Sequence, residues 1–517
     1  MESLAFYGGL TAMLLAVVWV LRMLNWALLQ PRRLERVLRS QGLKGSSYRP
    51  LRGDLKDMVR LGEEARSKPI PSYSHAIFPR VTAFLSRVVE TYGKENKVSF
   101  HWMGPLPRAV IADPDQAREV MANKTGEIGK PSTNYMLRYF MRGVIRQEGD
   151  KWAKHRKILN PAFHIERLKR MLPAFSACCD ELVDQWDKMA ATGKEVDVCV
   201  ELQNFTGDVI SRTAFGSSLE EGRRIFQLHD EQAMLVASAL LKALIPGYKY
   251  LPTRTNTRVK TIDKEVKDIL LSIIKNREES MKSGNTRNDD LLGMLLESNM
   301  QHIQEHGDAG LTTDEVVEEC RLFYFAGQET TAQLLTWVMV LLSMHQDWQE
   351  RAREEVLQVF GKEKPTFDGL SHLKTVTMIL YEVLRLYPPA IGLQRQVFKS
   401  VKIGDVVYPP GVLIFVSIIQ MHHDPDFWGQ DVEEFKPERF AEGVYKASEK
   451  NAFFPFSGGH RICIGQNFAM LESKLALCRI LQRFAFELSP SYTHAPCTVL
   501  TLKPQHGAPI RLRSLSL

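Results

Sequence analysis

The sequence predicts a mainly α, helix-rich protein with a minor β-sheet region, preceded by one N-terminal transmembrane helix. From residue 147 onward, apolar residues recur at intervals of three and four, which is typical of helices with one buried face. Alternation of apolar and polar residues, which indicates strands, is limited to residues 98–102, 109–112 and 395–419. Residues 3–21 carry no charge and are mostly apolar. Together these patterns predict one large helical domain behind a membrane anchor.

The apolar run near the N-terminus is long enough to cross a bilayer, since 19 residues at about 1.5 Å each span its hydrocarbon core. A cleaved signal peptide is the alternative. It is disfavoured because only Glu2 precedes the run and no small-residue cleavage site follows. Basic residues instead follow the run: Arg32, Arg33, Arg36, Arg39 and Lys44. Positive flanking charge keeps that side cytosolic. We expect an anchor (residues 1–30) that ends at Pro31, a basic linker (31–50) and a cytosolic catalytic domain (51–517) on the endoplasmic reticulum membrane.

Charge and cysteine content exclude several other classes of protein. The net charge of +7 is small for 517 residues and is spread along the chain, so no nucleic-acid partner is expected. The cysteine count is seven, an odd number, and no CxxC pair occurs. A disulfide framework or a zinc site is therefore not expected, and a reducing compartment fits better.

Capping residues, prolines and polar stretches predict where the elements of the large domain begin and end. Thr312 or Thr313 caps a long helix that runs to about residue 344 without proline, with Asp314 and Glu315 in its first turn. The other expected elements are a loop at 69–79, a helix after Asp113-Pro114, a polar loop at 282–290, a helix at 376–386 that stops at Pro388, and a last helix at 465–484.

The strongest local signal is a loop that delivers one cysteine immediately before the last helix, in the sequence FSGGHRICIG from Phe456 to Gly465. Gly458 and Gly459 allow tight turns and the close approach of a flat partner. The positive end of the following helix stabilises a thiolate at Cys463. Arg461 is placed to meet an acidic group. Taken alone, the cysteine could equally be a buried structural residue.

This loop resembles the heme-binding signature of the cytochrome P450 family, F-x-x-G-x-R-x-C-x-G. Phe456, Gly459, Arg461, Cys463 and Gly465 match it. The resemblance implies heme b with Cys463 as the axial thiolate ligand of the iron. Ser457 and Gly458, however, stand where the family pattern is expected to have Gly-Trp.

The long helix contains the sequence AGQETT from Ala326 to Thr331. Gly327 lies inside the helix, where glycine costs about 1 kcal/mol relative to alanine, and a threonine can bond back to a carbonyl one turn earlier. A packing glycine beside a solvent-facing Glu329 is the alternative. The stretch resembles the family's A/G-G-x-D/E-T motif, which implies that Thr330 holds dioxygen and a proton-relay water and that Glu329 brings protons in.

Glu382 and Arg385 lie three residues apart on one helix face, and a surface ion pair is the simplest interpretation. The surrounding sequence is too apolar for that. The pair resembles the family's E-x-x-R element, completed by Arg439, which implies a structural clamp on the cysteine loop. Trp152 and Arg156 resemble its W-x-x-x-R motif and, with Arg395, imply contacts with the heme propionates. We expect a structural role for His422 and His423.

The resemblance covers nearly the whole chain and is greatest to the plant P450 clan that contains secologanin synthase. It implies a monooxygenase that oxidises an apolar small molecule of terpenoid or related plant origin. The electrons come from NADPH through a separate flavoprotein, NADPH–cytochrome P450 reductase, because no dinucleotide motif or flavin domain is recognisable. The alternatives are a reductase-independent P450 isomerase or dehydratase and a non-enzymatic heme sensor. Expected pocket walls are residues 128–145, 234–245, Phe323, 391–393 and 499–500.

Overall fold

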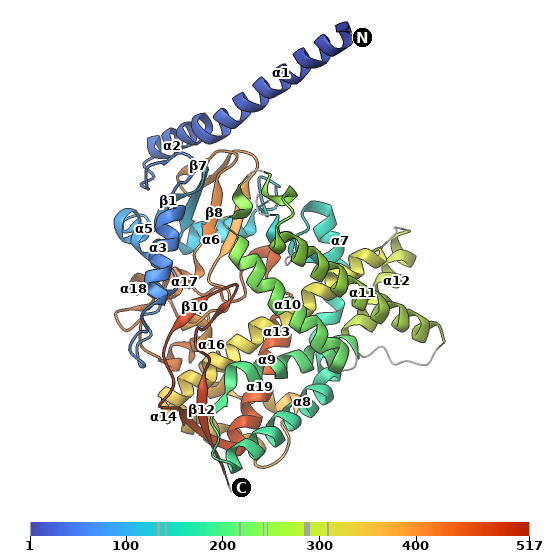
Figure 1. The fold of residues 1–517 in the computed structure, drawn as a ribbon. Coiled ribbons are helices and arrows are strands. Elements are labelled where there is room, and N and C mark those ends of the chain that lie inside the picture. Colours follow the sequence, from blue (N-terminus) through green and yellow to red (C-terminus); the bar gives the residue numbers. More distant parts are fainter. Residues whose placement is uncertain are drawn as a thin grey trace. The chain divides into compact units, whose positions relative to one another are not determined.

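The computed structural model describes residues 2–131, 135–139, 142–216, 219–240, 242–245, 247–283, 290–307 and 310–515. It confirms the expected fold class, since most of this chain is helical and the sheets are small (Figure 1). Of the polar loop expected at residues 282–290, residues 284–289 lie outside the described residues. The chain forms two compact units, the first from residues 1–67, 82–131 and 392–417 and the second from the remainder.

The first unit is built on a five-stranded sheet with the strand order β1-β2-β8-β5-β3. Its central pair, β2 and β8, is parallel, and the other neighbours are antiparallel. The strands of this unit are β1 (Val98–Met103), β2 (Leu106–Ile111), β3 (Ile128–Gly129), β5 (Leu393–Val397), β6 (Val401–Ile403), β7 (Val406–Tyr408) and β8 (Leu413–Val416). Its other elements include α3 (Leu55–Arg66), α5 (Ala83–Val88), η2 (Val89–Gly93) and α6 (Pro114–Ala122).

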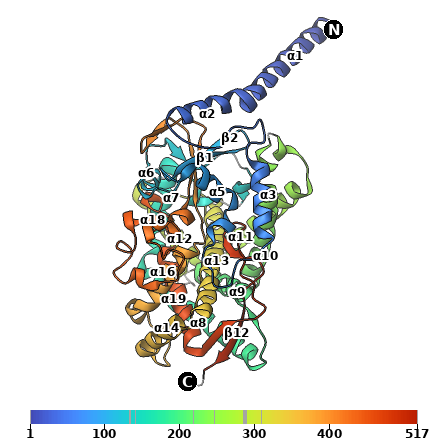
Figure 2. The same ribbon diagram turned by 90° about the vertical axis from the view of Figure 1, so that its left-hand side faces the viewer.

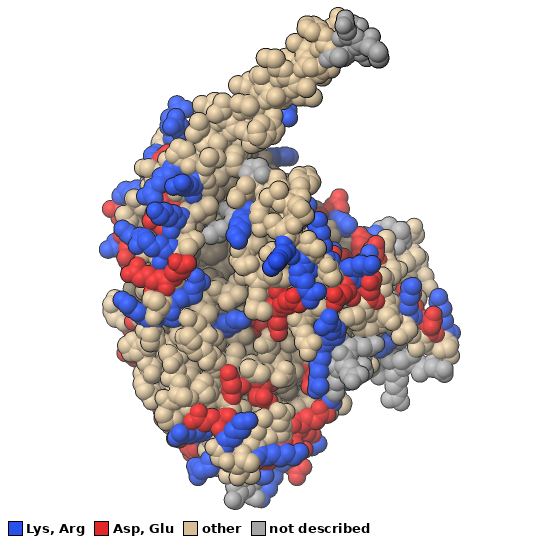
Figure 3. All heavy atoms as spheres, in the orientation of Figure 1, with Lys and Arg blue, Asp and Glu red and all other residues tan. Residues whose placement is uncertain are grey.

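The N-terminal helix is longer than expected. A helix of 35 residues, Phe6–Ser40, is apolar and long enough to cross a membrane. It comprises α1 (Glu2–Leu24), the π-helical turn η1 (Asn25–Leu29) and α2 (Gln30–Ser40). Figure 3 shows α1 as a surface nearly free of charged side chains, and Leu15 is 65% exposed, so α1 is not a core helix of this unit.

Pro31 does not end this helix, contrary to expectation, and the first ten residues of the expected linker are helical. The reason is local. Pro31 occupies the first turn of α2 and follows a π-helical turn. The regular backbone hydrogen bonds of the helix are already altered at this point, so the N–H that proline lacks does not interrupt the helix. Leu34 and Leu38 of α2 are buried within the first unit.

The second unit is helical and holds most of the predicted site. Its helices are α4 (Phe78–Val81), α7 (Gly149–Leu159), α8 (Ile165–Ala191), α9 (Val198–Ile210), α10 (Leu219–Ala239), α11 (Arg254–Lys282), α12 (Leu291–His306), α13 (Thr313–Met344), α14 (Gln346–Phe360), α15 (Phe367–His372), α16 (Lys374–Leu386), α17 (Ile418–His422), α18 (Pro425–Trp428) and α19 (Gln466–Arg483). Its strands are β4 (Val196–Asp197), β9 (Phe484–Leu488), β10 (Pro496–Thr498), β11 (Leu502–Pro504) and β12 (Pro509–Ser514). Its shorter helices include η3 (Met136–Tyr139), η4 (Gly143–Ile145), η5 (Asn160–Phe163), η6 (Ser211–Phe215) and η9 (Pro437–Phe440).

Helix α13 is the central element of this unit, and α9 lies beside it in both ribbon views (Figures 1 and 2). Thr312 caps it as expected. The Thr312 hydroxyl accepts the Glu315 N–H at 3.2 Å and the Glu315 carboxylate accepts the Thr312 N–H at 3.0 Å. Two backbone N–H groups that have no partner within the helix are thereby hydrogen-bonded.

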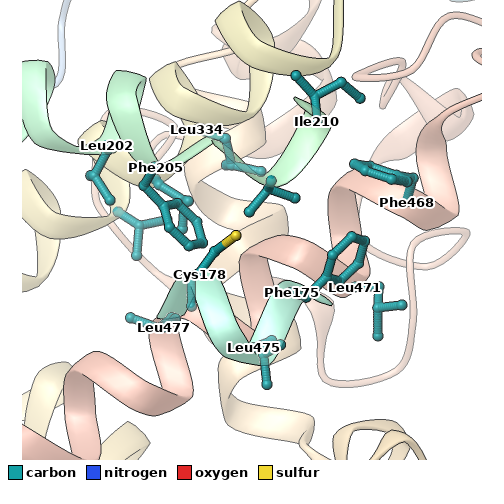
Figure 4. Packing of buried hydrophobic residues seen from close by; sticks show 14 of the residues in the cluster. Phe175, Cys178, Leu202, Phe205, Ile210, Leu334, Phe468, Leu471, Leu475 and Leu477 are labelled. Atoms are coloured by element: carbon teal, nitrogen blue, oxygen red, sulfur yellow. The ribbon is translucent and has the colours of Figure 1, made fainter. Parts of the chain in front are cut away.

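The core of the second unit lies between α8, α9, α13 and α19, whose apolar side chains meet around Cys178 (Figure 4). Phe175 of α8 meets Phe468 of α19 edge to face, with ring centroids 5.0 Å apart. Such pairs add about 0.5–1.5 kcal/mol to the burial of their area. This packing fixes the start of α19, where the cysteine loop ends.

Candidate active site

The loop before α19 is shaped by its own backbone. The Cys463 N–H donates to the Phe456 carbonyl at 3.0 Å, so the chain doubles back across the intervening residues. Of the two glycines expected to turn, only Gly459 has a positive φ, +65°, while Gly458 is extended. Ser457 also has a positive φ, +66°, at the position where the family pattern has glycine. This conformation costs an L residue about 1–2 kcal/mol, so the loop carries strain that a glycine would lack.

The thiol of Cys463 has surroundings suited to a metal ligand. All seven cysteines are free, and Cys463 is the exposed one among them. The protein atoms around it nevertheless desolvate the thiol and raise its pKa, whereas the Gly465 N–H bonded to the sulfur and the nearby Arg156 lower it. An accessible sulfur with a backbone donor aimed at it would suit the thiolate ligand of a heme, which would supply the positive charge that favours loss of the thiol proton.

Helix α7 is tied to the cysteine loop through Arg156. Its guanidinium donates to the Ile462 carbonyl at 2.9 Å and to the Asn160 side chain at 2.8 Å. Ile462 is the residue before the cysteine, so one hydrogen bond joins the W-x-x-x-R motif to the ligand loop. Burial lowers the pKa of Arg156.

Arg461 and Trp152 are also in contact. The Arg461 guanidinium lies over the Trp152 ring at 4.8 Å, and His460 meets the same ring edge-on at 5.1 Å. Arg461 donates to the Gln147 carbonyl at 2.9 Å and pairs with Glu148, so this arginine does find an acidic group on the protein itself. Two guanidinium groups beside one loop form a donor set that fits the carboxylates of a heme.

The acid–alcohol pair lies within α13. The Thr330 hydroxyl donates to the Ala326 carbonyl at 2.7 Å, which is the back-bonding expected from the sequence. A Cβ added to Gly327 would lie 2.8 Å from the end of the Ile210 side chain, so α9 packs closely on α13 here and a larger residue would require Ile210 to shift. Gly327 is therefore also a packing glycine, as the alternative interpretation held.

Glu329 does not face solvent freely. One of its carboxylate oxygens accepts a hydrogen bond from the Thr501 hydroxyl at 2.5 Å, and its side chain is half-buried. Thr501 was not among the predicted site residues. No local signal could have identified it, because 172 positions separate the two residues.

Glu382 and Arg385 form a buried pair, not a surface one. Both side chains are 0% exposed, and two hydrogen bonds of 2.8 and 2.7 Å join them. Arg385 also donates to the carbonyls of His422, Val432 and Glu434. A fully buried fork of this kind uses all the donors of one guanidinium.

Arg439 of η9 joins this pair. Its Nε lies 3.5 Å from the Glu382 carboxylate. It also donates to the Trp428 carbonyl and contacts the Asp431 carboxylate, both at 2.9 Å. The three residues expected to form a clamp are therefore together, and they link α16 to the segment that precedes the cysteine loop.

Comparison with known proteins identifies the family. The family model described as Cytochrome P450 matches residues 67–507, most of the chain. The chain belongs to the cytochrome P450 family. This P450 is 56% identical over 516 residues to Cytochrome P450 CYP72A616 of Paris polyphylla, covering 98% of this chain and 99% of the relative. It is 51% identical over 522 residues to 11-oxo-beta-amyrin 30-oxidase of Glycyrrhiza uralensis, covering 99% and 98%. It is also 50% identical over 510 residues to Cytochrome P450 72A15 of Arabidopsis thaliana, covering 98% of each.

These matches identify the chain as a plant P450 monooxygenase related to the CYP72A proteins, as the sequence motifs predicted. The family implies a heme-thiolate centre. The roles of the individual site residues remain predictions. Arg395 is on β5 of the first unit, where it is buried and donates to the neighbouring Gln394 carbonyl at 3.0 Å.

The P450 has two further polar contacts near the predicted site. His422 accepts the Phe454 N–H at 3.0 Å, and His423 bonds to the Leu386 carbonyl at 2.9 Å, so both histidines contact backbone groups. A pair missed in the sequence joins α7 to α13. His155 Nδ1 lies 2.6 Å from the buried Glu319 carboxylate. Its only signal was the position of His155 inside the W-x-x-x-R motif.

The predicted pocket walls are brought together in part. Residues of η3, α10, η7 (Lys242–Leu244) and α11 form an apolar cluster against which Phe325 and Leu500 pack: Met136, Val236, Ala239, Ala243 and Val259. Phe323 instead packs in the main core, with its ring 5.5 Å from that of Phe163. Of the predicted walls, residues 132–134, 140–141 and 241 lie outside the described residues.

Proposed function

We propose that this P450 binds heme b through the Cys463 thiolate and oxidises a triterpenoid with electrons delivered from NADPH by a partner reductase. The observation that supports the heme ligand is the accessible sulfur beside the Gly465 N–H at the start of α19. When bound, the heme supplies activation of dioxygen. The hydrogen bond from Gly465 limits the electron density that the sulfur donates.

The remaining roles are assigned to residues around this ligand. Arg156 and Arg461 bind the heme propionates, because guanidinium groups pair with carboxylates through two parallel hydrogen bonds, and Trp152 adds its indole N–H as a donor. Arg395 is assigned the same role from the sequence motif alone. Phe456 packs against the core and accepts the Cys463 N–H, which holds the loop closed. The clamp of Glu382, Arg385 and Arg439 fixes the chain that leads into this loop.

Thr330 and Glu329 supply protons to the reacting oxygen. Oxidation of the substrate uses two electrons and two protons per dioxygen, with one oxygen atom entering the substrate and the other leaving as water. Glu329 carries a proton in from the side of α13, and the Thr330 hydroxyl passes it on. General acid–base help of this kind contributes about 10²–10⁴-fold.

The N-terminal helix anchors the protein in the endoplasmic reticulum membrane as a single-pass segment with the catalytic domain in the cytosol. The exposed apolar surface of α1 and the arginines of α2 support this orientation. The partners are membrane lipid, NADPH–cytochrome P450 reductase as the electron donor, and an apolar small molecule. The substrate class rests on the relative named 11-oxo-beta-amyrin 30-oxidase, which shares 51% identity over nearly the whole chain.

The test combines a carbon monoxide difference spectrum with turnover. The full-length protein is incubated with 11-oxo-β-amyrin, NADPH and a plant P450 reductase, and the product is identified by mass. We expect an oxidised product that depends on both NADPH and reductase. A product formed without reductase would indicate the isomerase or dehydratase instead, and heme binding with no turnover of any triterpenoid would indicate the sensor.

The ligand is tested by Cys463→Ser, for which we expect folded protein without the thiolate-type carbon monoxide band, because a serine oxygen does not provide thiolate donation. The control is Cys199→Ser, which replaces a half-buried cysteine on α9 and leaves the loop intact. Retention of the band and of turnover in Cys463→Ser would contradict the assignment.

A further inference from the structure

The Glu329 carboxylate is held by a residue from another part of the chain. Thr501 donates to it at 2.5 Å and is only 6% exposed. Thr501 is the last residue of the three-residue turn (residues 499–501) that joins β10 to β11. The Val499 N–H donates to the Thr501 carbonyl at 3.3 Å, and the Leu502 N–H donates to the Pro389 carbonyl at 3.1 Å. Both ends of the turn are thereby fixed.

The same turn contacts the apolar cluster assigned to the substrate pocket. Leu500, the neighbour of Thr501, packs there together with Phe325, which lies four residues before Glu329 on α13. Within one short turn, Leu500 contacts the predicted pocket wall and the next residue, Thr501, donates a hydrogen bond to Glu329.

A further acidic side chain lies close enough to the Glu329 carboxylate to interact with its charge. The group shown to sense the Glu329 charge is Asp230 of α10, which is also influenced by Lys503 of β11 and accepts a hydrogen bond from the Gln203 side chain of α9 at 3.1 Å. Burial, together with the Glu329 charge, raises the pKa of Asp230 to about 6, and Lys503 and the Gln203 hydrogen bond oppose the shift. Asp230 still reaches solvent. Asp230 is therefore a solvent-exposed acid close to Glu329, from which a proton can reach a carboxylate that is held in place.

We propose that Thr501 is a positioning residue for the oxidation reaction: its hydroxyl holds the Glu329 carboxylate where protons enter and couples it to the pocket turn. This rests on the proposed function, in which Glu329 carries protons toward Thr330. Without the hydroxyl, the Glu329 carboxylate loses this hydrogen bond and is free to adopt other side-chain conformations. More of the reduced dioxygen then leaves as hydrogen peroxide, which carries away two electrons and two protons and leaves the substrate unoxidised.

The experiment compares Thr501→Val, which keeps the shape and removes the hydroxyl, with Thr501→Ser, which keeps the hydroxyl. Full-length protein is supplied with NADPH and reductase but no organic substrate, and peroxide is measured against NADPH consumed. In this condition, complete reduction of dioxygen to water takes four electrons and four protons, so poor proton supply appears as peroxide. We expect the ratio of peroxide to water to rise on the order of tenfold in Thr501→Val and to return to nearly the wild-type value in Thr501→Ser.

The matched control is Thr498→Val. Thr498 lies on the same hairpin, and its buried hydroxyl has no hydrogen-bond partner within the described part of the chain, so its loss should leave the ratio unchanged. The carbon monoxide spectrum checks that every variant binds heme. If Thr501→Val fails to do so, Thr501→Ala is used in its place. We expect Thr501→Val to add nothing in a Glu329→Gln background, because the two residues act as one unit.

The outcomes separate the two proposals. If Glu329→Gln raises the peroxide ratio and neither Thr501→Val nor its alanine substitute does, the role of Thr501 is wrong and that of Glu329 stands. Additive effects in the double variant would also overturn the coupling. If Glu329→Gln and Thr330→Ala both leave the ratio unchanged, the proposed proton supply itself is wrong.

Discussion

Arg385 is the residue whose loss should most affect the folding of the heme domain. Its guanidinium makes two hydrogen bonds to Glu382 and three to the carbonyls of His422, Val432 and Glu434, and its side chain is 0% exposed. Arg385→Ala removes all five hydrogen bonds. It leaves the Glu382 charge without its main partner and three carbonyl oxygens without a donor.

The size of the effect follows from these contacts. Breaking a buried ion pair by removing one partner costs about 3–5 kcal/mol. Each buried carbonyl left without its donor adds about 1 kcal/mol, which brings the loss to about 6–8 kcal/mol. A domain is typically stable by only about 5–15 kcal/mol, so the variant should be unfolded or barely folded. Arg385→Lys should recover little, because an ammonium cannot reproduce the planar fork.

The assay is heme incorporation and the thiolate-type carbon monoxide band of the full-length protein, followed by urea unfolding where any folded protein remains. Arg118→Ala is the control. Arg118 pairs with Asp115 at the same i,i+3 spacing and 2.6 Å, but these side chains are 39% and 59% exposed, so its loss should cost less than about 1 kcal/mol. If Arg385→Ala and Arg118→Ala were equally stable, burial would not decide the strength of the clamp and the reasoning would be refuted.

The remaining predictions concern the anchor, the relay and a buried acid. Deleting residues 1–30 should weaken membrane association without loss of heme, because Ala27 is the one buried side chain among the described residues 6–30; loss of heme in a folded truncation would contradict this. Thr330→Ala should keep the heme spectrum but release peroxide while NADPH is consumed, whereas Thr336→Ala, which removes the same 2.7 Å back-bond two turns later on α13, should stay coupled. Equal coupling in both variants would contradict the relay. Burial raises the pKa of Glu472 well above its usual value, and the neighbouring Thr331 hydroxyl offsets only part of this shift. The folded state thus binds this proton more tightly than the unfolded state, so stability falls as pH rises above the ordinary carboxyl pKa, by up to about 1.4 kcal/mol per pH unit. Glu472→Leu should therefore gain free energy of unfolding relative to the wild type as pH rises, and a difference independent of pH would disprove the neutral, buried acid.

Local patterns in the sequence predicted much of this protein. The start of α13 at Thr312, its uninterrupted run to Met344 and the end of α16 before Pro388 depend on caps, periodicity and proline, which act within a few residues. The Cys463 loop was recognisable for the same reason, because its turn residues and its ligand lie within ten positions.

Only the tertiary structure decided where each polar side chain finds its partner. Pro31 continues a helix that it was expected to end, because a π-helical turn precedes it. Arg461 meets Glu148 across more than 300 positions, and Glu329 meets Thr501 across 172. Hydrogen bonds act over about 3 Å and carry no trace in local periodicity, so such pairs exist only once separate elements have packed and have excluded water from between them.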